Sequence, residues 1–414
     1  MADGALGAIK EAREEAYSTP LEDIDMSLGE RFASDTFWPF FERLRAEAPI
    51  HYCKESEFGP YWSVTRYHDI VAVESNHEVF SSAKGISIGD NTSDFQLPMF
   101  IAMDPPKHDE QRKVVSPIVG TENLKGLASL IRERAAKIID ELPVGETFDW
   151  VDRVSVELTA QMLATLFGFP FEERRKLTYW SDLTTTPNEE ITEDEWKAEM
   201  MGCLARFSEL WAERVAAPPA KDLISMLAHG EATREMPPME FLGNVLLLIV
   251  GGNDTTRNSI SGGLIALNRH PDAYERLRTE PALIETMVPE IIRWQTPVAH
   301  MRRTAMVDFE LGGQTIRAGD KVIMWYVSGN RDETAIEDPD GFIIDRARPR
   351  QHLSFGFGIH RCVGMRLAEM QLRTVWEEIL KRHPKIEVVG EPTRLKSCFL
   401  RGIRSLPVRI PASA

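Results

Sequence analysis

Cysteine is scarce in this chain of 414 residues, and its spacing excludes two common structural roles. The four cysteines, Cys53, Cys203, Cys362 and Cys398, lie far apart and form no Cys-x-x-Cys pair. A disulfide framework is therefore not expected in a chain of this length. A zinc site needs three or four ligands close together, and only His360 is near Cys362 in the sequence, so zinc fits poorly there.

Long apolar runs and an excess of positive charge are also missing. The apolar run at 245–250 stops at two glycines and is far shorter than the roughly 20 residues that span a bilayer. Residues 1–20 carry acidic side chains and lack the apolar centre of a signal peptide, so we expect a cytoplasmic protein with no membrane anchor. The net charge of −16 argues against a nucleic acid partner, because phosphate binding needs a basic surface.

The composition that remains is that of an ordinary globular protein with a sizeable core, at 43% hydrophobic and 27% charged residues. Helical apolar spacing dominates from residue 106 to residue 294. The first 49 residues are expected to form acidic loops and one helix at 37–49, and the Gly-, Ser- and Asn-rich stretch 81–103 a long apolar-lined loop. Alternating apolar and polar residues predict short strands at 50–67, 309–327 and 385–410. We therefore predict one mainly α domain over 1–414, with small β-sheets at its margin.

A run of poor helix formers, Gly-Gly-Asn-Asp-Thr-Thr at 251–256, interrupts the helical pattern of 240–271. Each Gly costs about 1 kcal/mol relative to Ala, and each of the other four about 0.5 kcal/mol. A simple break between two helices is one interpretation. Because apolar spacing leads into the glycines and resumes after them, a continuous but locally distorted helix fits better. Such a helix would let a flat ligand lie on the glycines, and Asp254 beside Thr255 is suited to relaying protons through water.

Glu290 and Arg293 are three residues apart and would share one face of a helix. A weak surface ion pair is the ordinary interpretation of this spacing. The neighbouring apolar residues Ile291, Ile292 and Trp294 instead indicate a buried helix. Because a buried pair needs further hydrogen bonds to offset its desolvation, we expect a third partner, most naturally another arginine.

The stretch 353–364, Leu-Ser-Phe-Gly-Phe-Gly-Ile-His-Arg-Cys-Val-Gly, places three glycines around Cys362. Glycine weakens helix and strand alike, so the backbone here is expected to approach another group closely. The residues alone leave Cys362 open as a nucleophile, a buried thiol or a ligand to something larger.

In their order and spacing, these three features resemble the cytochrome P450 superfamily of haem-thiolate monooxygenases. The features are the run at 251–256, Glu-x-x-Arg at 290–293, and the Phe-x-x-Gly-x-x-x-Cys-x-Gly loop at 355–364. The resemblance covers essentially the whole chain and is greatest to the soluble bacterial branch. It implies the P450 fold, a triangular helical domain with a β-rich margin, and haem b (iron protoporphyrin IX) as the cofactor.

The resemblance assigns roles to individual residues. Cys362 matches the axial thiolate ligand of the haem iron, and such a ligand favours O–O cleavage. Asp254 and Thr255 match the acid and alcohol that deliver protons for dioxygen activation. Glu290 and Arg293 match a structural pair. The other positions implied are Arg346 as the third member of that pair, His108, Arg112, Arg303 and His360 at the haem propionates, Phe355 against the haem, and Gly358 and Gly364 beneath it.

A narrower resemblance is to the bacterial P450 enzymes that hydroxylate the terminal carbon of medium-chain alkanes and fatty acids. It implies an apolar aliphatic substrate, oxidised at an unactivated C–H bond with dioxygen. The alternatives are a hydroxylase of another small apolar substrate such as a terpene, a haem enzyme driven by peroxide, and a haem binder without activity. The expected substrate pocket consists of Leu247, Gly251, Val298, Ala299 and Phe100, with Phe95, Leu97 and Met99 in the loop at its entrance.

The chain has no flavin or iron–sulfur motif, so it is expected to contain no fused reductase and to receive electrons from outside. A 2Fe–2S ferredoxin with its ferredoxin reductase is the partner that the resemblance implies. Six arginines and only one acid, Glu369, lie between Arg346 and Arg373 in this otherwise acidic chain. Arg346 is expected to be structural. The others, Arg361 and Arg366 among them, could form a basic face for an acidic ferredoxin.

Overall fold

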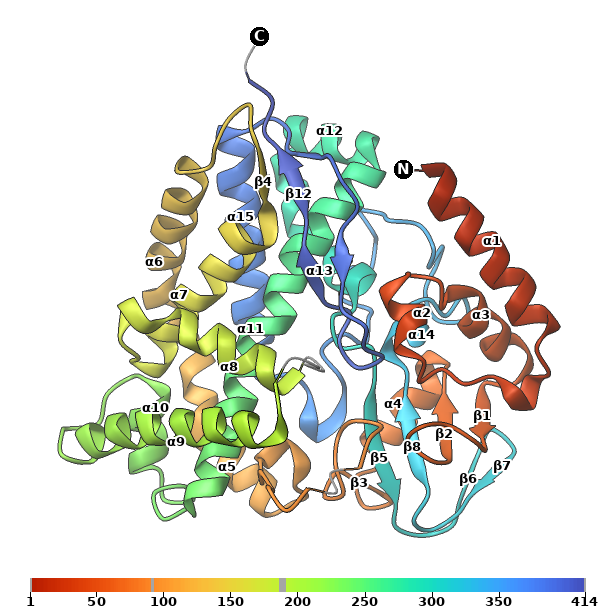
Figure 1. The fold of residues 1–414 in the computed structure, drawn as a ribbon, viewed down its shortest axis with the longest axis horizontal. Helices are drawn as coiled ribbons and strands as arrows, with labels where there is room; N and C mark the ends of the chain where they lie inside the picture. Colours follow the sequence, from red (N-terminus) through yellow and green to blue (C-terminus); the bar gives the residue numbers. More distant parts are fainter. Residues whose placement is uncertain (1, 91–92, 186–190, 413–414) are drawn as a thin grey trace.

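Helices form most of the protein, and small sheets lie along one side. The computed structural model describes residues 2–90, 93–185 and 191–412, and its ribbon has a roughly triangular outline (Figure 1). The predicted mainly α fold with marginal sheets is confirmed. Within the described residues, no helix is both long and apolar enough to cross a membrane.

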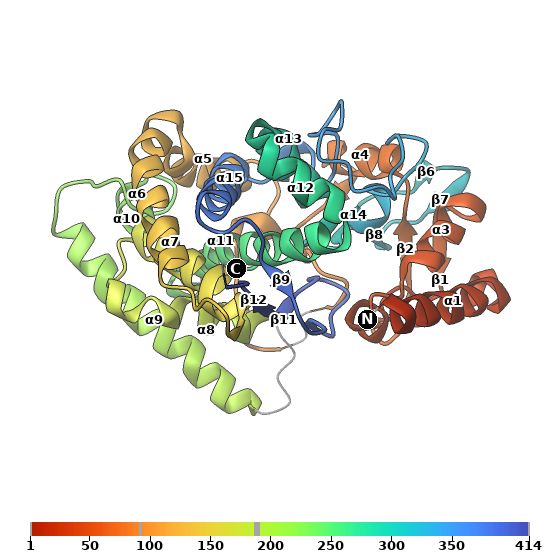
Figure 2. The ribbon, with the colours of Figure 1, turned by 90° about the horizontal axis from the view of Figure 1, so that it is seen from above.

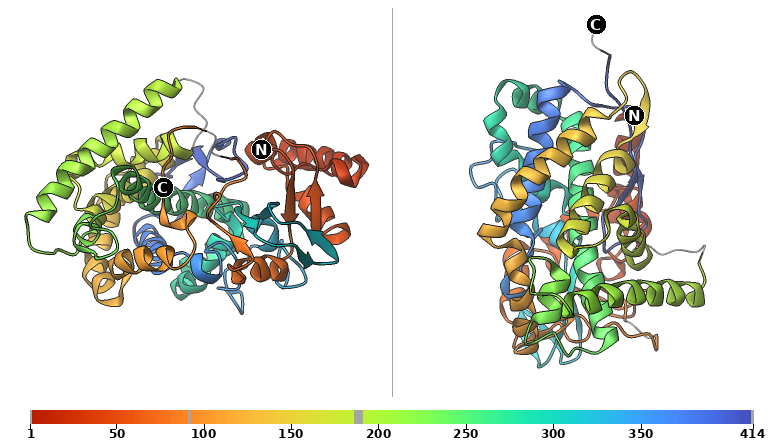
Figure 3. Two further views of the ribbon diagram at one scale, coloured as in Figure 1. Left: turned by 90° about the horizontal axis from the view of Figure 1, so that it is seen from below. Right: turned by 90° about the vertical axis from the view of Figure 1, so that its left-hand side faces the viewer.

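The regular elements follow the predicted order along the chain. The longer helices are α1 (Ala2–Ser18), α3 (Trp38–Glu47), α4 (Tyr67–Ser75), α5 (Lys107–Val115), α6 (Thr121–Asp140), α7 (Glu157–Phe167), α8 (Arg175–Thr185), α9 (Glu193–Val215), α11 (Pro238–Arg269), α12 (Pro271–Thr279), α13 (Ile284–Gln295) and α15 (Met365–Arg382). The short helices are α2 (Gly29–Ala33), α10 (Leu223–His229) and α14 (Tyr326–Gly329). In Figure 3, α9 reaches beyond the rest of the helical body.

The central helix is α11, which packs against α7, α8, α13 and α15. It continues through 251–256 without a break or a change of helix type, so the predicted continuity is confirmed and the expected local distortion is not seen. Two later glycines explain how α13 can lie so close. A Cβ on Gly263 would come within 2.8 Å of Ile291 Cδ1, and one on Gly262 within 2.2 Å of Gln295 Oε1.

The sheets are small and lie at the margin of the helical body. The main sheet has the strand order β1-β2-β8-β5-β3, and β1 and β2 form the antiparallel hairpin predicted at 50–67. The strands are β1 (Ile50–Cys53), β2 (Tyr61–Val64), β3 (Phe80–Ser81), β4 (Thr147–Asp149), β5 (Met301–Ala305), β6 (Phe309–Leu311), β7 (Gln314–Ile316), β8 (Lys321–Met324), β9 (Glu387–Val388), β10 (Thr393–Arg394), β11 (Ile403–Ser405) and β12 (Pro407–Arg409). Between β3 and residue 100 the described chain forms no regular element, as expected for the long loop, whose residues 91–92 lie outside the described part.

Residues 2–18 correct the prediction of loops, because they form α1, which lies beside α3 (Figure 2). The contact face of α1 presents small side chains, Ala12 and Ala16, where larger apolar residues would have given a clear helical signal. Polar contacts with α3 also hold α1 in place. Arg13 pairs with Glu42 at 2.6 Å, and Arg43 donates to the carbonyl oxygen of Ala16 at 2.5 Å.

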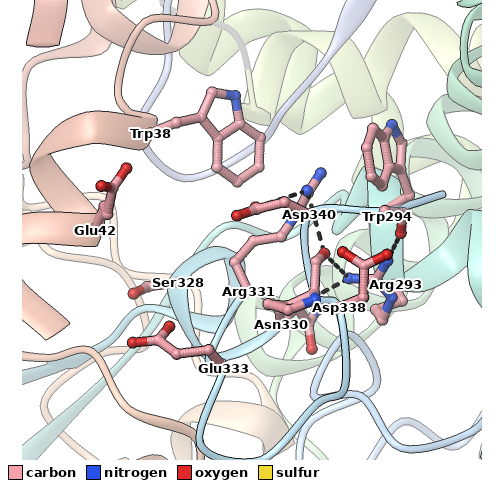
Figure 4. Close-up of polar contacts among 12 residues, drawn as sticks. Trp38, Glu42, Arg293, Trp294, Ser328, Asn330, Arg331, Glu333, Asp338 and Asp340 are labelled. Atoms are coloured by element: carbon pink, nitrogen blue, oxygen red, sulfur yellow. Dashed lines mark hydrogen bonds and ion pairs between the residues drawn. The ribbon is translucent and has the colours of Figure 1, made fainter. Parts of the chain in front are cut away.

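A buried arginine connects α3, against which α1 packs, to the helical core. The Arg331 guanidinium lies between the rings of Trp38 on α3 and Trp294 on α13, 4.6 and 3.8 Å from their centroids (Figure 4). Asp340 accepts a hydrogen bond from it at 3.1 Å. A cation between two aromatic faces is attracted by both rings. Arg331 therefore fixes the position of α3 relative to α13.

The predicted pair on α13 is completely buried and has the expected third partner. Arg293 donates to both carboxylate oxygens of Glu290 at 2.8 Å, and Arg346 donates to the same two oxygens at 2.9 and 3.1 Å. Arg293 also donates to the backbone carbonyls of Asn330 and Pro339. Burial alone would raise the pKa of Glu290, but the bonds from both arginines outweigh it and hold the pKa below its ordinary value.

Replacing Glu290 by Gln is expected to destabilise the protein by about 3–5 kcal/mol, because two buried guanidinium groups would lose their counter-charge. The shift of the urea unfolding midpoint measures this loss. Since the pKa of Glu290 is lowered, its contribution is complete above about pH 5 and is lost as the pH falls through the folded-state pKa.

Glu285 is a matched control on the same helix. It pairs with Arg373 at 3.0 Å, but both side chains are about half exposed. Glu285→Gln should therefore change the free energy of unfolding by less than about 1 kcal/mol. Equal shifts for the two variants would contradict the role given to the buried network.

Candidate functional site

A cavity of about 2220 Å³ separates α11 from the loop that carries Cys362. Small-molecule pockets are usually about 300–1,000 Å³, so this volume leaves room for a large flat group together with a second, smaller molecule. Its walls come from α11, the loop after β3, the start of β5, the cysteine loop and the turn between β10 and β11. Segments that are far apart in the sequence thus line the same cavity.

The cysteine loop is held in one conformation by its own backbone. The amide N of Cys362 donates to the Phe355 carbonyl oxygen at 2.8 Å, and Gly356 and Gly358 adopt positive φ angles of +66° and +62°. Phe355 and Cys362 both line the cavity. A Cβ on Gly364 would lie only 3.8 Å from the Cys362 Sγ, so the chain passes close beside the thiol.

Two opposing effects act on the Cys362 thiol, which is open to the cavity but otherwise surrounded by protein. Burial raises its pKa, whereas the backbone N–H groups of Gly364 and Met365 and the charge of Arg112 act in the opposite direction. Because α15 begins at Met365, the thiol lies at the N-terminus of a helix. Helix N-termini favour thiolates and therefore metal ligation by cysteine.

Gly358 allows the cysteine loop to contact α4. A Cβ at this position would come within 2.2 Å of the Glu74 carbonyl oxygen. The Glu74 side chain is itself buried, and it accepts hydrogen bonds from the Phe357 amide, the Tyr326 hydroxyl and Arg303. Glu74 was not predicted as a site residue from the sequence. Its only signal was an acid in the apolar run of a short helix, Ile-Val-Ala-Val-Glu at 70–74.

Basic side chains form one rim of the cavity. Arg112, Arg303 and His360 line it, whereas His108 is buried behind His360, with the two ring centroids 4.2 Å apart. His108 Nε2 and His360 Nδ1 are buried without a hydrogen-bond partner among the described residues. Burial lowers the pKa of both histidines, and Arg303 lowers that of His360 further. Two cations and the unsatisfied Nδ1 of His360 suit an anionic edge such as a pair of carboxylates, whereas His108, which was also predicted at this edge, lies behind it.

The α11 wall of the cavity is bare where the sequence has its two glycines. No atom lies within 4 Å of a Cβ built on Gly251, so this position faces open space, whereas one on Gly252 would meet Leu163 Cδ2 at 2.8 Å. Thr255 also lines the cavity, and its hydroxyl donates to the Gly251 carbonyl oxygen at 2.8 Å. A flat group can therefore approach the helix here.

Asp254 does not line the cavity, although the adjacent Thr255 does. Its carboxylate points to α8, where the Ser181 hydroxyl donates to it at 2.7 Å, and Arg257 pairs with it at 2.5 Å. The same Arg257 nitrogen also contacts Asp182, which is partly exposed. Burial raises the pKa of Asp254, and Arg257 opposes this shift. Asp254 itself thus lies outside the cavity, and Arg257 connects it to Asp182 on α8, with Arg257 and Asp182 both lining the cavity.

The apolar part of the wall contains most of the predicted substrate residues. Leu247, Val298 and Phe100 line the cavity, together with Phe95, Leu97 and Met99 of the loop after β3. Ala299 needs a correction. Its side chain is fully buried in the core cluster with Ile323 and Trp325, because successive residues in extended chain point to opposite sides and Val298 takes the cavity side.

These features fit haem b. The cavity is large, a thiol at a helix N-terminus and a bare stretch of helix both line it, and one rim combines two arginines with the unsatisfied Nδ1 of His360. Cys362 would hold the iron, and Arg112, Arg303 and His360 would hold the two carboxylates. A fold and site of this kind define a haem-dependent monooxygenase.

Comparisons with known proteins agree with this class. The family model described as cytochrome P450 matches residues 216–388. Linalool 8-monooxygenase of Pseudomonas putida is 36% identical over 94% of this chain and 99% of that protein. Methyl-branched lipid omega-hydroxylase of Mycobacterium tuberculosis is 31% identical over 94% of this chain and 95% of that protein. The structure of CYP153D17 from Sphingomonas sp. PAMC 26605 is 50% identical with a TM-score of 0.89, covering 94% of this chain and 99% of that one.

The chain belongs to the cytochrome P450 family. It is an oxidoreductase, a haem b monooxygenase that hydroxylates apolar substrates with dioxygen.

Gly358→Ala is expected to lower haem incorporation strongly, because the new methyl group would collide with the α4 backbone at Glu74. We expect at least a fivefold weaker long-wavelength band of the reduced carbon monoxide complex per mole of protein. That band reports thiolate-ligated haem.

Gly356→Ala provides the control. Its φ is also positive, but a Cβ there would lie 3.5 Å from the Glu74 carboxylate, an ordinary contact. Only the backbone strain of about 1–2 kcal/mol should remain. A band weakened equally in both variants would show that the contact with α4 does not matter.

Proposed function

We propose that this P450 hydroxylates the terminal carbon of medium-chain alkanes or fatty acids, with Cys362 as the axial ligand of its haem. The observation that carries the proposal is the apolar wall above Thr255, formed by Leu247, Val298 and Phe100. Such a wall offers no polar group near the reacting carbon. A polar group of the substrate would therefore have to bind farther along the cavity. The similarity to a lipid omega-hydroxylase supports the same choice.

A second candidate is the hydroxylation of a small terpene. It is favoured by the 36% identity with linalool 8-monooxygenase over nearly the full length of both chains. A compact terpene would need to contact the same Leu247 and Val298 side chains. The two candidates therefore differ in the shape of the substrate and share the site of oxidation.

The residues around the cavity have separate tasks in the proposed reaction. When bound, haem b supplies the redox-active iron that activates dioxygen. The Thr255 hydroxyl donates its proton to the Gly251 carbonyl and presents acceptor lone pairs to the cavity, and a rotation away from this carbonyl would make it a proton donor there. Leu247 and Val298 exclude water from the space beside it and orient the chain end.

Asp254 supplies protons from the side of α8. The Ser181 hydroxyl is hydrogen-bonded to its carboxylate, and Arg257 connects it to the partly exposed Asp182. The raised pKa of Asp254 brings its protonated form closer to working pH, as a proton donor requires. A rotation of this side chain about χ1 would bring the proton from the α8 side to the cavity.

Electrons are proposed to come from a 2Fe–2S ferredoxin with its reductase. Ion pairs within the protein reduce the number of arginines that are available to contact the ferredoxin. Arg350 pairs with Glu369 at 3.0 Å and Arg373 with Glu285 at 3.0 Å, so both are partly neutralised. Arg348, Arg361 and Arg366 are exposed and have no ion pair within the described residues, and Arg361 and Arg366 are nearer to Cys362 in the sequence than Arg348 is. These two are the best candidates for contact with an acidic partner.

Leu247→Phe and Val298→Phe are expected to shift hydroxylation of a straight-chain substrate by shortening the space above Thr255. The measurement is the regiochemistry of products from a panel of alkanes, fatty acids and cyclic terpenes. The parent should give mainly terminal alcohols, and both variants should favour shorter chains. Val215→Phe, an exposed position on α9, should leave the profile unchanged.

Products oxidised mainly within the chain, or turnover of terpenes alone, would refute the terminal hydroxylase and favour the second candidate. An unchanged profile in both variants would remove Leu247 and Val298 from the substrate pocket.

Arg361→Glu and Arg366→Glu are expected to slow reduction by an acidic ferredoxin at low salt and to flatten its salt dependence, because screened charge attraction drives the encounter. Stopped-flow reduction at several ionic strengths measures this. Arg373→Glu, whose arginine is already paired, should change the rate far less. Reduction of both variants at the parent rate at every ionic strength would exclude this docking face.

A further inference from the structure

Glu74 is a buried acid at the junction of three parts of the haem site. It lies near the end of α4, its side chain is 1% exposed, and it lines the cavity. Its Oε1 accepts from the Tyr326 hydroxyl and, at 3.3 Å, from Arg303 Nη2, while its Oε2 accepts from the Phe357 amide. One carboxylate therefore joins the cysteine loop, the start of α14 and an arginine of the basic rim on β5.

The charge of Glu74 changes the electrostatic balance of this rim. Arg112 and Arg303 are cations, whereas burial lowers the pKa of His108 and His360 and keeps their rings neutral. Glu74 thus offsets one of two positive charges beside the cavity. Burial raises its own pKa, but Arg303, Tyr326 and the Phe357 amide all favour the ionised form.

We propose that Glu74 is a positioning residue that holds the cysteine loop against Arg303 and that its buried negative charge favours ferric over ferrous haem. A negative charge beside the cofactor stabilises the more positive, oxidised iron, and the buried surroundings screen that charge weakly. The proposal rests on the placement of haem at Cys362 under the proposed function.

The positioning part has a geometric basis. The Phe357 amide belongs to the loop that ends at Cys362, and the next residue, Gly358, lies directly against the α4 backbone. Without the carboxylate, this amide would be buried next to an unpaired Tyr326 hydroxyl and Arg303. Unpaired buried donors cost about 1–3 kcal/mol each, so the loop would be expected to shift.

The test of the charge is a reductive titration of the haem-loaded protein with dithionite and redox dyes, in which one electron passes to ferric iron. Glu74→Gln removes the charge and keeps an oxygen that accepts from the Phe357 amide. We expect at least a threefold shift of the ferric–ferrous equilibrium toward ferrous, about 28 mV for a one-electron couple. Tyr326→Phe keeps the charge and should stay within twofold of the parent.

Glu378→Gln is the matched control for losing a buried carboxylate. Glu378 is 3% exposed and forms ion pairs with Arg132, Lys381 and Arg382, but it lies 13 residues beyond Met365, about 20 Å along α15. Its replacement should leave the equilibrium at the parent value. An unchanged equilibrium in Glu74→Gln, or an equal shift in Glu378→Gln, would overturn the charge effect.

The test of positioning is the rate of haem transfer to apomyoglobin, which does not depend on turnover. Glu74→Leu, with no acceptor for the loop, should lose haem at least tenfold faster than the parent, and Glu74→Gln should stay within threefold. A parent-like rate for Glu74→Leu would overturn the positioning role. The long-wavelength carbon monoxide band of the parent separately tests haem at Cys362, so a failure of the proposed function would be distinguished from a failure of this inference.

Discussion

The ion-pair network of Glu290, Arg293 and Arg346 is the interaction on which the remaining structure depends. It is fully buried and fixes α13 to the long connection that leads into the cysteine loop. Asn330 continues the network, because its side chain bonds both the Leu353 amide and the Ser354 hydroxyl. Charges with such a high desolvation cost have one favourable arrangement, and this arrangement sets where the cysteine loop starts.

From that fixed base, the protein places two dissimilar surfaces opposite each other. On one side of the cavity is the cysteine loop with its thiol and the basic rim. On the other side is α11, where Gly251 leaves the helix surface bare. The hydroxyl and the acid both belong to α11 but point in different directions, since Thr255 lines the cavity while Asp254 bonds to Ser181 on α8. One helix, α11, therefore presents apolar and hydroxyl groups to the cavity and an acid to α8.

Much of this was predictable from the sequence, and the parts that were not share a physical cause. The hairpin at 50–67, the continuous α11 and the third partner of Glu290 follow from local spacing and from the cost of burying charge. Three features were not predicted from the sequence. Helix α1 packs through alanines, Ala299 differs from Val298 only in the direction of its side chain, and Glu74 acts through partners more than 200 residues away.

The family, the cysteine loop and the elements that carry it follow from the amino-acid sequence alone, because motif residues and periodicity are local properties of the chain. Only the tertiary structure decided which way each functional side chain points and what it meets. Asp254 faces α8, and Glu74 joins Arg303 to the cysteine loop. Arg350 and Arg373 form ion pairs with Glu369 and Glu285. Direction and pairing depend on contacts between distant segments, and these exist only once the chain has packed.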